Sequence, residues 1–293
     1  MTLLIIGSNG QLGWELCRQG VSRGFDILPV DIPAFDITDP RHVADTIANP
    51  AIEVVVNASA YTAVDRAESE PDKAFAVNRD GPALVAKACA DRNIPLIHVS
   101  TDYVFDGSKN EAYRETDPVS PLGVYGESKA AGEGEVRECL THHIIIRTAW
   151  LYGVHGNNFV KTMLRLGRER EKLRVVADQY GCPTYAADLA GAVLAIAERK
   201  KRNQPVRWGT YHYCGRGVTT WHGLAEKTIE LAKRYEPVTV TEIEAITTAD
   251  YPTPAKRPAY SVLDCSLMEQ HFGVTRPPWE ESLERMLGSH LKY

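Results

Sequence analysis

A tyrosine and a lysine on one stretch of chain are the side chains best suited to chemistry. Tyr125 and Lys129 lie four residues apart within residues 124–129, and such positions share one face of a helix. An ammonium beside a phenol favours the phenolate, so the spacing predicts a lowered tyrosine pKa. That tyrosine could exchange a proton with a carbonyl or alcohol oxygen. An edge-of-core aromatic residue beside a solvated charge shows the same spacing, so the pair needs a cofactor site upstream.

A glycine turn near the start of the chain indicates such a site. Residues 3–6 form an apolar run typical of a buried parallel strand, and Gly7, Gly10 and Gly13 follow it before a helical pattern. Glycines allow a tight turn and close approach of the backbone to a pyrophosphate, while the helix N-terminus offers free N–H groups. We therefore predict a dinucleotide-binding turn.

Acidic residues after the second predicted strand extend this site. Residues 26–30 predict the strand, and Asp31 follows it, where a carboxylate can accept a hydrogen bond from a ribose 2′-hydroxyl. The same charge would repel a 2′-phosphate, which favours NADH over NADPH. Asp36 and Ile37 are candidates for adenine contact. The alternatives are a solvated loop acid at Asp31 and a plain helix cap by Asp39 or its neighbour.

Two further predicted strands end beside the same crevice. Residues 53–57 lead into small residues that let a flat cofactor lie close to the carboxyl end of a strand. Residues 95–99 lead into Thr101, whose hydroxyl could donate to a substrate carbonyl beside the tyrosine. A local turn capped by Asp102 is the alternative interpretation of that strand end.

Alternating strands and helices predict an α/β fold with a doubly wound parallel (Rossmann) sheet. We expect a dinucleotide-binding domain over residues 1–155 and a smaller mixed α/β substrate lobe over residues 156–293. Within the lobe, the segment near residues 185–200 is expected to pack on the first domain. A length of 293 residues suits one large domain with a smaller lobe.

Composition excludes several classes of function. The net charge of −5 argues against a general nucleic-acid binder. No apolar run reaches the ~18 residues needed to span a bilayer, and no basic segment precedes the first strand, so neither a membrane span nor a signal peptide is expected. Six cysteines are scattered without metal spacing, which predicts reduced thiols in a cytoplasmic protein.

With these residues in place, the chain resembles the extended short-chain dehydrogenase/reductase superfamily and, within it, the dTDP-4-dehydrorhamnose reductase family. The general marks are the three glycines and the tyrosine–lysine pair. The resemblance covers nearly the whole length. Its narrower marks are GQLGWEL at 10–16, DRAESEP at 65–71, STDYVFDG at 100–107, RTAW at 147–150 and DQYGCPT at 178–184.

The resemblance implies that NADPH or NADH reduces the C4 ketone of dTDP-4-dehydro-6-deoxy-L-mannose (dTDP-4-dehydro-β-L-rhamnose) to dTDP-L-rhamnose. Tyr125 would protonate the developing oxyanion, and Lys129 would tune Tyr125 and hold the nicotinamide ribose. Thr101 would take the place of the catalytic hydroxyl residue of the superfamily. The implied substrate contacts are Thr101, Asp102 and Trp150. The implied cofactor contacts are Gly7, Gly10, Gln11, Leu12, Gly13, Asp31, Asp36, Ile37, Ala60, Tyr61, Thr62, Tyr125 and Lys129.

The resemblance also raises the question of a metal. Some family members are described as dimers that hold Mg²⁺ between subunits through glutamates. Glu15 matches one such position, Asp188 stands at another, and the tail ending at Tyr293 has no glutamate. Monomer and homodimer both stay open, as does Mg²⁺ binding through Glu15.

Two other functions are compatible with these motifs. A nucleotide-sugar epimerase or dehydratase shares the glycine turn and the tyrosine–lysine pair and recycles a tightly held NAD⁺. Asp102 directly follows Thr101, where a dehydratase needs a carboxylate, but the segments at 147–150 and 178–184 favour the reductase. A non-catalytic subunit like the β subunit of methionine adenosyltransferase would need none of Thr101, Tyr125 and Lys129, so their presence argues against it.

Overall fold

The computed structural model of the chain describes residues 1–291. The strands are β1 (Thr2–Ile6), β2 (Asp26–Val30), β3 (Ile52–Asn57), β4 (Leu96–Thr101), β5 (His143–Thr148), β6 (Leu151–Tyr152), β7 (Lys172–Val176), β8 (Tyr180–Gly181), β9 (Thr184–Tyr185), β10 (Gly209–His212), β11 (Thr219–Thr220) and β12 (Glu242–Ile246). The helices are α1 (Gln11–Ser22), α2 (Pro40–Ile47), α3 (Val64–Ala67), α4 (Pro71–Phe75), η1 (Ala76–Asp80), α5 (Gly81–Asp91), η2 (Asp102–Val104), α6 (Val124–Cys139), α7 (Phe159–Glu169), α8 (Ala186–Lys201), α9 (Trp221–Ala232), η3 (Thr248–Asp250), α10 (Ser266–Phe272) and α11 (Trp279–Leu291).

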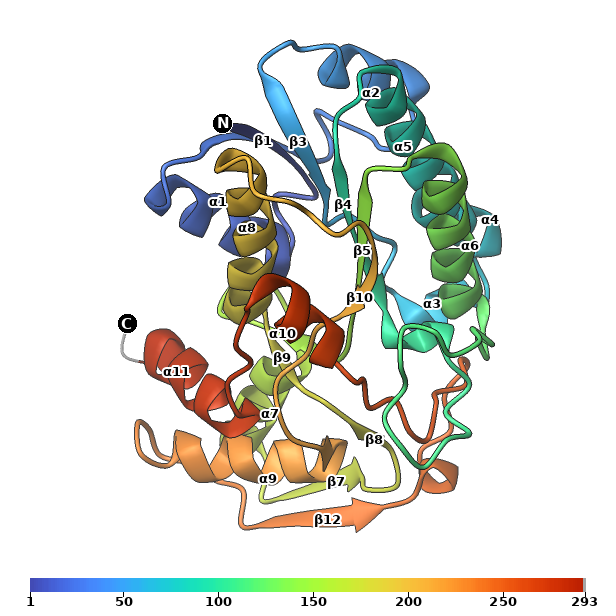
Figure 1. Cartoon of the computed structure of the whole chain (residues 1–293). Helices are drawn as coiled ribbons and strands as arrows, with labels where there is room; N and C mark the ends of the chain where they lie inside the picture. The colour runs from blue at the N-terminus through green and yellow to red at the C-terminus, as the bar shows by residue number, and fades with distance from the viewer. Residues whose placement is uncertain (292–293) are drawn as a thin grey trace.

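A parallel sheet of six strands forms the centre of the molecule (Figure 1). Its order is β10-β5-β4-β3-β1-β2, and every neighbouring pair is parallel. The chain runs from β1 outward to β2 and then returns to β3 on the other side of β1. A crevice therefore opens at the carboxyl ends of β1 and β3, where open α/β sheets bind ligands. The predicted doubly wound fold is confirmed.

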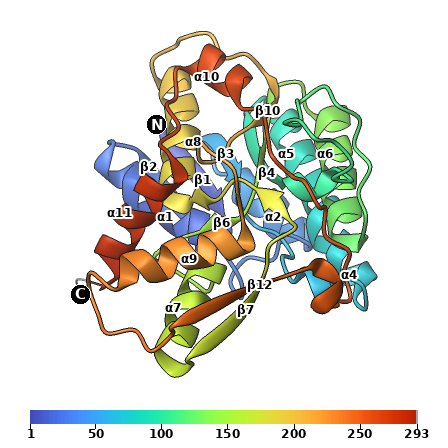
Figure 2. The same ribbon diagram turned by 90° about the horizontal axis from the view of Figure 1, so that it is seen from below.

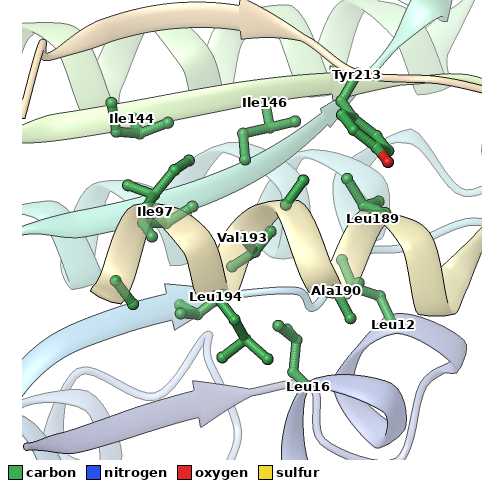
Figure 3. Packing of buried hydrophobic residues seen from close by; sticks show 14 of the residues in the cluster. Leu12, Leu16, Ile97, Ile144, Ile146, Leu189, Ala190, Val193, Leu194 and Tyr213 are labelled. Carbon is green, nitrogen blue, oxygen red and sulfur yellow. The ribbon is translucent and has the colours of Figure 1, made fainter. Parts of the chain in front are cut away.

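Side chains of the strands alternate between two hydrophobic cores. Leu3 and Ile5 of β1 enter one core, whereas Leu4 and Ile6 enter the other, as a period of two residues requires. Helices α1 and α8 cover the first face, and α2, α5 and α6 cover the second (Figure 1). Figure 3 shows side chains of α8, among them Leu189 and Val193, packed between Leu12 and Leu16 of α1 and the isoleucines of the sheet.

The second lobe is built around the helices α7, α9 and α11 and the parallel pair β7 and β12 (Figure 2). Two elements from this later part of the chain lie with the first domain instead. Helix α8 packs against α1, and β10 pairs with β5 at the edge of the central sheet. The sequence pattern does not predict the place of β10 in this sheet. A domain division near residue 155 stays a prediction.

Helix α6, which carries the tyrosine–lysine pair, approaches η1 very closely. A Cβ atom on Gly132 would lie 2.0 Å from the carbonyl oxygen of Asn78, whereas one on Gly134 would meet no atom within 4 Å. Glycine at residue 132 is therefore required by a backbone contact, and glycine at residue 134 is not.

We predict opposite effects of alanine at these two glycines. Gly132→Ala forces the helix away from η1 and should lower the free energy of unfolding by about 1–3 kcal/mol. Gly134→Ala places a better helix former in open space and should raise it by about 0.5–1 kcal/mol. Urea unfolding of both variants and the wild type measures the difference. Equal changes in the free energy of unfolding would show that the backbone of η1 can move away from residue 132 without loss of stability.

Candidate active site

A cavity of about 780 Å³ lies at the carboxyl ends of the central strands. It is open to the second lobe, whose residues form the opposite wall. The cavity brings together residues from the glycine turn, two strand ends, α6 and the segment after β5. The predicted site residues that line it are Gly7, Gly10, Gln11, Leu12, Asp31, Ala60, Thr62, Thr101, Asp102, Tyr125, Lys129 and Trp150.

The glycine turn forms a cradle that a side chain would fill. Gly7 has φ +84°, and a Cβ atom there would lie 2.6 Å from the backbone nitrogen of Ser59. Gly13 lies behind the turn, where a Cβ atom would be 2.0 Å from the carbonyl oxygen of Gly7. Gly13 thus lets α1 approach the turn but does not line the cavity. This geometry fits a dinucleotide pyrophosphate at the N-terminus of α1.

Asp31 is fastened to this turn. Its Oδ2 accepts a hydrogen bond from the backbone N–H of Asn9 at 2.8 Å, and its Oδ1 accepts one from the N–H of Ile32. The carboxylate lines the cavity and is held at the end of β2. Its geometry suits a ribose hydroxyl, and that role stays a prediction.

Two predicted adenine contacts do not line the cavity. The Asp36 carboxylate accepts hydrogen bonds from the backbone N–H and the hydroxyl of Thr38, at 2.9 and 2.8 Å. Ile37 is buried in the core beneath α2 and α5. The structure supports the alternative for this turn, because Asp39 caps α2 by accepting from the N–H of Arg41. Contact of Asp36 and Ile37 with the adenine stays a prediction.

Tyr61 also turns away from the cavity. Its phenol donates to Oε2 of Glu70 at 2.7 Å, and its backbone N–H donates to Oδ1 of Asn78 at 2.8 Å. Ala60 and Thr62, on either side of it, line the cavity. Ala58 and Ser59 line it as well, so within residues 58–62 only Tyr61 turns its side chain away from the cavity.

The proposed catalytic residues lie together. Thr101 ends β4, and Tyr125 and Lys129 lie one turn apart on α6. The Thr101 hydroxyl donates to Oδ1 of Asp102 at 3.0 Å and accepts from the N–H of Tyr103. The Tyr103 ring meets the Tyr125 ring edge-on, with centroids 5.4 Å apart. The three side chains share one wall of the cavity.

The predicted lowering of the tyrosine pKa is wrong for this structure. Burial raises the pKa of Tyr125 to about 12, and the Thr101 hydroxyl only partly opposes the rise. The Lys129 ammonium donates to the carbonyl oxygen of Val99 at 2.7 Å. Burial lowers the pKa of Lys129 to about 8, against an opposing effect of Glu133. Helical spacing brought the two residues together but did not fix where the ammonium points.

The carboxyl group of Asp102 is buried, and one of its oxygens lacks a hydrogen-bond partner within residues 1–291. Its side chain is 2% exposed, and its Oδ2 has no hydrogen bond of good geometry. Burial raises the pKa of Asp102 to about 6, although the hydroxyls of Ser261 and Thr101 temper the rise. A buried polar atom without a partner is costly. Asp102 lines the cavity, but Oδ2 itself is shielded from solvent.

A buried ion pair holds α6 against the sheet. Glu133 accepts from Nε of Arg147 on β5 at 2.8 Å and from its Nη2 at 2.7 Å, and both side chains are at most 2% exposed. Burial alone would raise the pKa of Glu133, but the hydrogen bonds from Arg147 hold it below its ordinary value. Glu133 lies one turn beyond Lys129, so the pair anchors the helix just below the catalytic residues.

Sequence reasoning missed several residues of the opposite wall. Trp221 and Asn158 both line the cavity. The Asn158 amide donates to Oε1 of Gln11 at 3.0 Å and thereby links the glycine turn to the start of α7. Both residues stand at helix starts, where Asn158 and Thr220 are ordinary caps. Those signals mark a helix boundary and carry no information about a distant glycine turn.

The two carboxylates suggested for Mg²⁺ are already paired. Glu15 is 2% exposed and accepts from Nη2 of Arg18 at 2.8 Å. Asp188 accepts from Nη2 of Arg285 at 2.7 Å and from the hydroxyl of Ser282 at 2.5 Å. Within residues 1–291 there is no group of three or more His, Cys, Asp or Glu side chains that could hold a metal ion. Within a single chain these residues do not form a Mg²⁺ site, and binding of Mg²⁺ through Glu15 between two subunits stays a prediction.

Comparison with solved structures supports the fold and the overall arrangement. The chain superposes on a dTDP-4-dehydrorhamnose reductase from Clostridium acetobutylicum with a TM-score of 0.92, at 38% identity and 99% coverage of both chains. It superposes on the same enzyme from Bacillus anthracis, in complex with NADP, with a TM-score of 0.91 at 38% identity, covering 98% of this chain and 99% of the other. A UDP-glucose 4-epimerase from Thermus thermophilus, 20% identical, shares the fold with a TM-score of 0.80.

Sequence comparison places the chain more narrowly. The RmlD substrate binding domain model matches residues 1–291. The dTDP-4-dehydrorhamnose reductase of Sinorhizobium fredii is 44% identical over 290 residues, which cover 98% of this chain and 97% of that protein. The corresponding enzyme of Escherichia coli K12 is 42% identical with the same coverage. The chain belongs to the RmlD family, whose members at this level of identity include these dTDP-4-dehydrorhamnose reductases.

Proposed function

We propose that this protein is an NAD(P)H-dependent reductase that converts the C4 ketone of dTDP-4-dehydro-β-L-rhamnose into the alcohol of dTDP-L-rhamnose, the last step of dTDP-rhamnose biosynthesis. One observation carries the proposal. Thr101, Tyr125 and Lys129 share a single cavity with the glycine turn, in a chain that matches reductases of that name from end to end.

The chain's own residues have defined tasks in this reaction. When bound, the nicotinamide supplies the hydride that reduces C4. Tyr125 is protonated at neutral pH because its pKa is about 12, so it can donate a proton to the oxygen that gains negative charge. The Thr101 hydroxyl, whose single hydrogen points to Asp102 in this structure, can donate to the same oxygen once it rotates away from Asp102. Lys129, charged below its pKa, lines the same cavity and can donate to a ribose hydroxyl.

Recognition of the substrate is assigned to Thr101, Asp102 and Trp150. Asp102 and Trp150 both line the cavity: the carboxyl group can bind a sugar hydroxyl, and the indole offers an apolar wall. Recognition of the cofactor is assigned to the glycine turn, Asp31 and the residues around Thr62. The carboxylate of Asp31 favours the 2′-hydroxyl of NADH over the 2′-phosphate of NADPH. The proposed reaction can use either cofactor.

Asp102 also supports a second candidate, a nucleotide-sugar epimerase or dehydratase. A buried carboxylic acid next to Thr101 could protonate a leaving hydroxyl. Such an enzyme would keep NAD⁺ bound through purification. Release of a nicotinamide nucleotide from the denatured, freshly purified protein would favour this candidate over the reductase.

The setting of the protein stays partly a prediction. All six cysteines are free thiols, in keeping with the cytoplasmic location expected from their spacing. Among the helices of residues 1–291, none combines the length and the apolar character needed to cross a membrane. Monomer and homodimer both remain compatible with the proposal.

The first experiment follows NADPH and NADH oxidation with dTDP-4-dehydro-β-L-rhamnose. The wild type should oxidise at least one cofactor and form dTDP-L-rhamnose. Tyr125→Phe removes the proton donor and should lower kcat by ~10²–10⁴ with cofactor binding retained. Tyr235→Phe, the same change outside the cavity, is the matched control. A folded wild type without turnover would refute the proposal, and full activity of Tyr125→Phe would refute the assigned proton donor.

The pH dependence should reveal the buried lysine. Burial disfavours the ammonium and places the pKa of Lys129 at about 8, so the charge is present below this pH and is lost above it. We expect kcat/KM to fall as the pH rises through about 8, because this ratio reports the free enzyme. Lys129→Met should be slower and should lack this limb. A wild-type profile that stays level well above this pH would contradict the assignment.

Removal of divalent metal should leave the enzyme active. Mg²⁺ sheds its water reluctantly and binds through free carboxylates, whereas Glu15 and Asp188 are each paired with an arginine. Treatment with EDTA followed by desalting should therefore change neither kcat/KM nor the thermal midpoint. A loss of activity that added Mg²⁺ restores would show that these ion pairs give way to the metal.

A further inference from the structure

Two tryptophans from distant parts of the chain stack in the cavity wall. Trp150 follows β5, and Trp221 begins α9. Their ring centroids lie 3.6 Å apart, and the planes differ by 8°. Both residues line the cavity that holds Tyr125. Of the two, the sequence predicted only Trp150 as a substrate contact. The role of Trp221 is therefore inferred from the residues that it contacts.

The backbone holds Trp150 in an uncommon conformation. Its φ is +49°, a region that non-glycine residues rarely adopt and that surrounding contacts must enforce. Its carbonyl oxygen accepts from the N–H of Thr184 at 3.2 Å. A Cβ atom on Gly181 would lie 2.5 Å from Cε2 of the Trp150 indole. The backbone of β8 therefore approaches the ring directly, which a larger residue at 181 would prevent.

A chain of hydrogen bonds fixes the partner ring. Nε1 of Trp221 donates to Oε1 of Gln179 at 3.1 Å. Gln179 is 5% exposed, and its amide donates to the hydroxyl of Thr248 at 3.0 Å. That hydroxyl donates in turn to Oδ1 of Asp178 at 2.7 Å. The Phe159 ring, 4.7 Å away between centroids, packs on Trp221 as well.

The local strand pairing explains why these residues meet. Strands β8 and β11 pair antiparallel, with Thr220 opposite Tyr180 and Thr219 opposite Gly181. This pairing sets Gln179, just before β8, beside Trp221, just after β11. The same short ribbon thus supplies the hydrogen bond that orients Trp221 and the glycine that admits Trp150.

We propose that Trp221 is a positioning residue for the substrate: together with Gln179 it holds the Trp150 indole ready for the nucleotide sugar. This inference rests on the proposed function, in which Trp150 contacts the substrate. A flat indole can pack on the apolar face of a sugar ring or on a base. Fixing the ring before binding avoids the loss of side-chain freedom on binding. Trp221 should therefore govern affinity for the sugar nucleotide and leave the proton transfer from Tyr125 largely intact.

The test compares two variants that loosen Trp150 in different ways. Trp221→Ala removes the stacked ring, and Gln179→Met keeps the stack but removes the acceptor for Trp221 Nε1. We expect Trp221→Ala to raise KM for the sugar nucleotide roughly tenfold, the scale of one aromatic contact. Gln179→Met should raise it less, and in both variants kcat should change less than KM. Trp208→Ala, outside the cavity, is the matched control and should behave as the wild type.

Binding measured without turnover separates the possible outcomes. Calorimetric titration with dTDP-L-rhamnose should show weaker binding to both variants, with the Kd for NADH unchanged. Thermal midpoints show whether a variant is folded. If Trp221→Ala does not fold, the KM and Kd values of Gln179→Met and Trp221→Phe test the inference in its place. A wild type that turns over while all variants keep its KM would overturn this inference alone. A folded wild type that neither turns over nor binds dTDP-L-rhamnose would overturn the proposed function, and this inference with it.

Discussion

The ion pair between Glu133 and Arg147 fixes the helix that carries the catalytic residues. Both groups are buried and meet through two hydrogen bonds, so a shift of α6 along the sheet would leave the Arg147 guanidinium without its carboxylate in a medium of low dielectric constant, while Glu133 would keep Arg137 of its own helix. Loss of one partner of such a pair is strongly destabilising. The close contact of Gly132 with η1 limits movement toward the other side. Together, the ion pair and the glycine contact fix the position of Tyr125 and Lys129 relative to the end of β4.

The same burial that fixes the helix determines its chemistry. Away from water, neutral forms are favoured, so the pKa of Tyr125 rises and that of Lys129 falls. For a reduction this is a suitable state, because the phenol keeps the proton that it has to deliver. Burial also raises the pKa of Asp102. A bound ligand that makes polar contacts with this carboxyl group would change its protonation.

Local sequence signals predicted the parts of the site that depend on local geometry. A buried strand followed by spaced glycines predicts the turn at Gly7, and helical spacing predicts that Tyr125 and Lys129 share a face. The alternation of strands and helices predicts the parallel sheet, whose carboxyl edge then brings Thr101 to the same crevice. Each of these inferences starts from a pattern within one segment or from the regular alternation of segments.

The features that were missed all depend on such distant contacts. The direction of the Lys129 ammonium is set by a carbonyl group on β4, and Ile37 is taken into the core by α5. Trp221 enters the cavity only because a two-residue strand pairs with another some 40 residues earlier. The edge position of β10 likewise depends on β5. No periodicity in one segment reports the segment that will pack on it.

One face of the central sheet is covered largely by chain that follows the dinucleotide-binding half. Val193 and Leu194 of α8, Tyr211 of β10, and Met268 and Phe272 of α10 all belong to the core that includes Leu3 and Ile5. The two lobes are therefore not separable modules. A fragment ending near residue 155 would expose this apolar face to solvent, and a hinge between independently folded halves has no place in this topology.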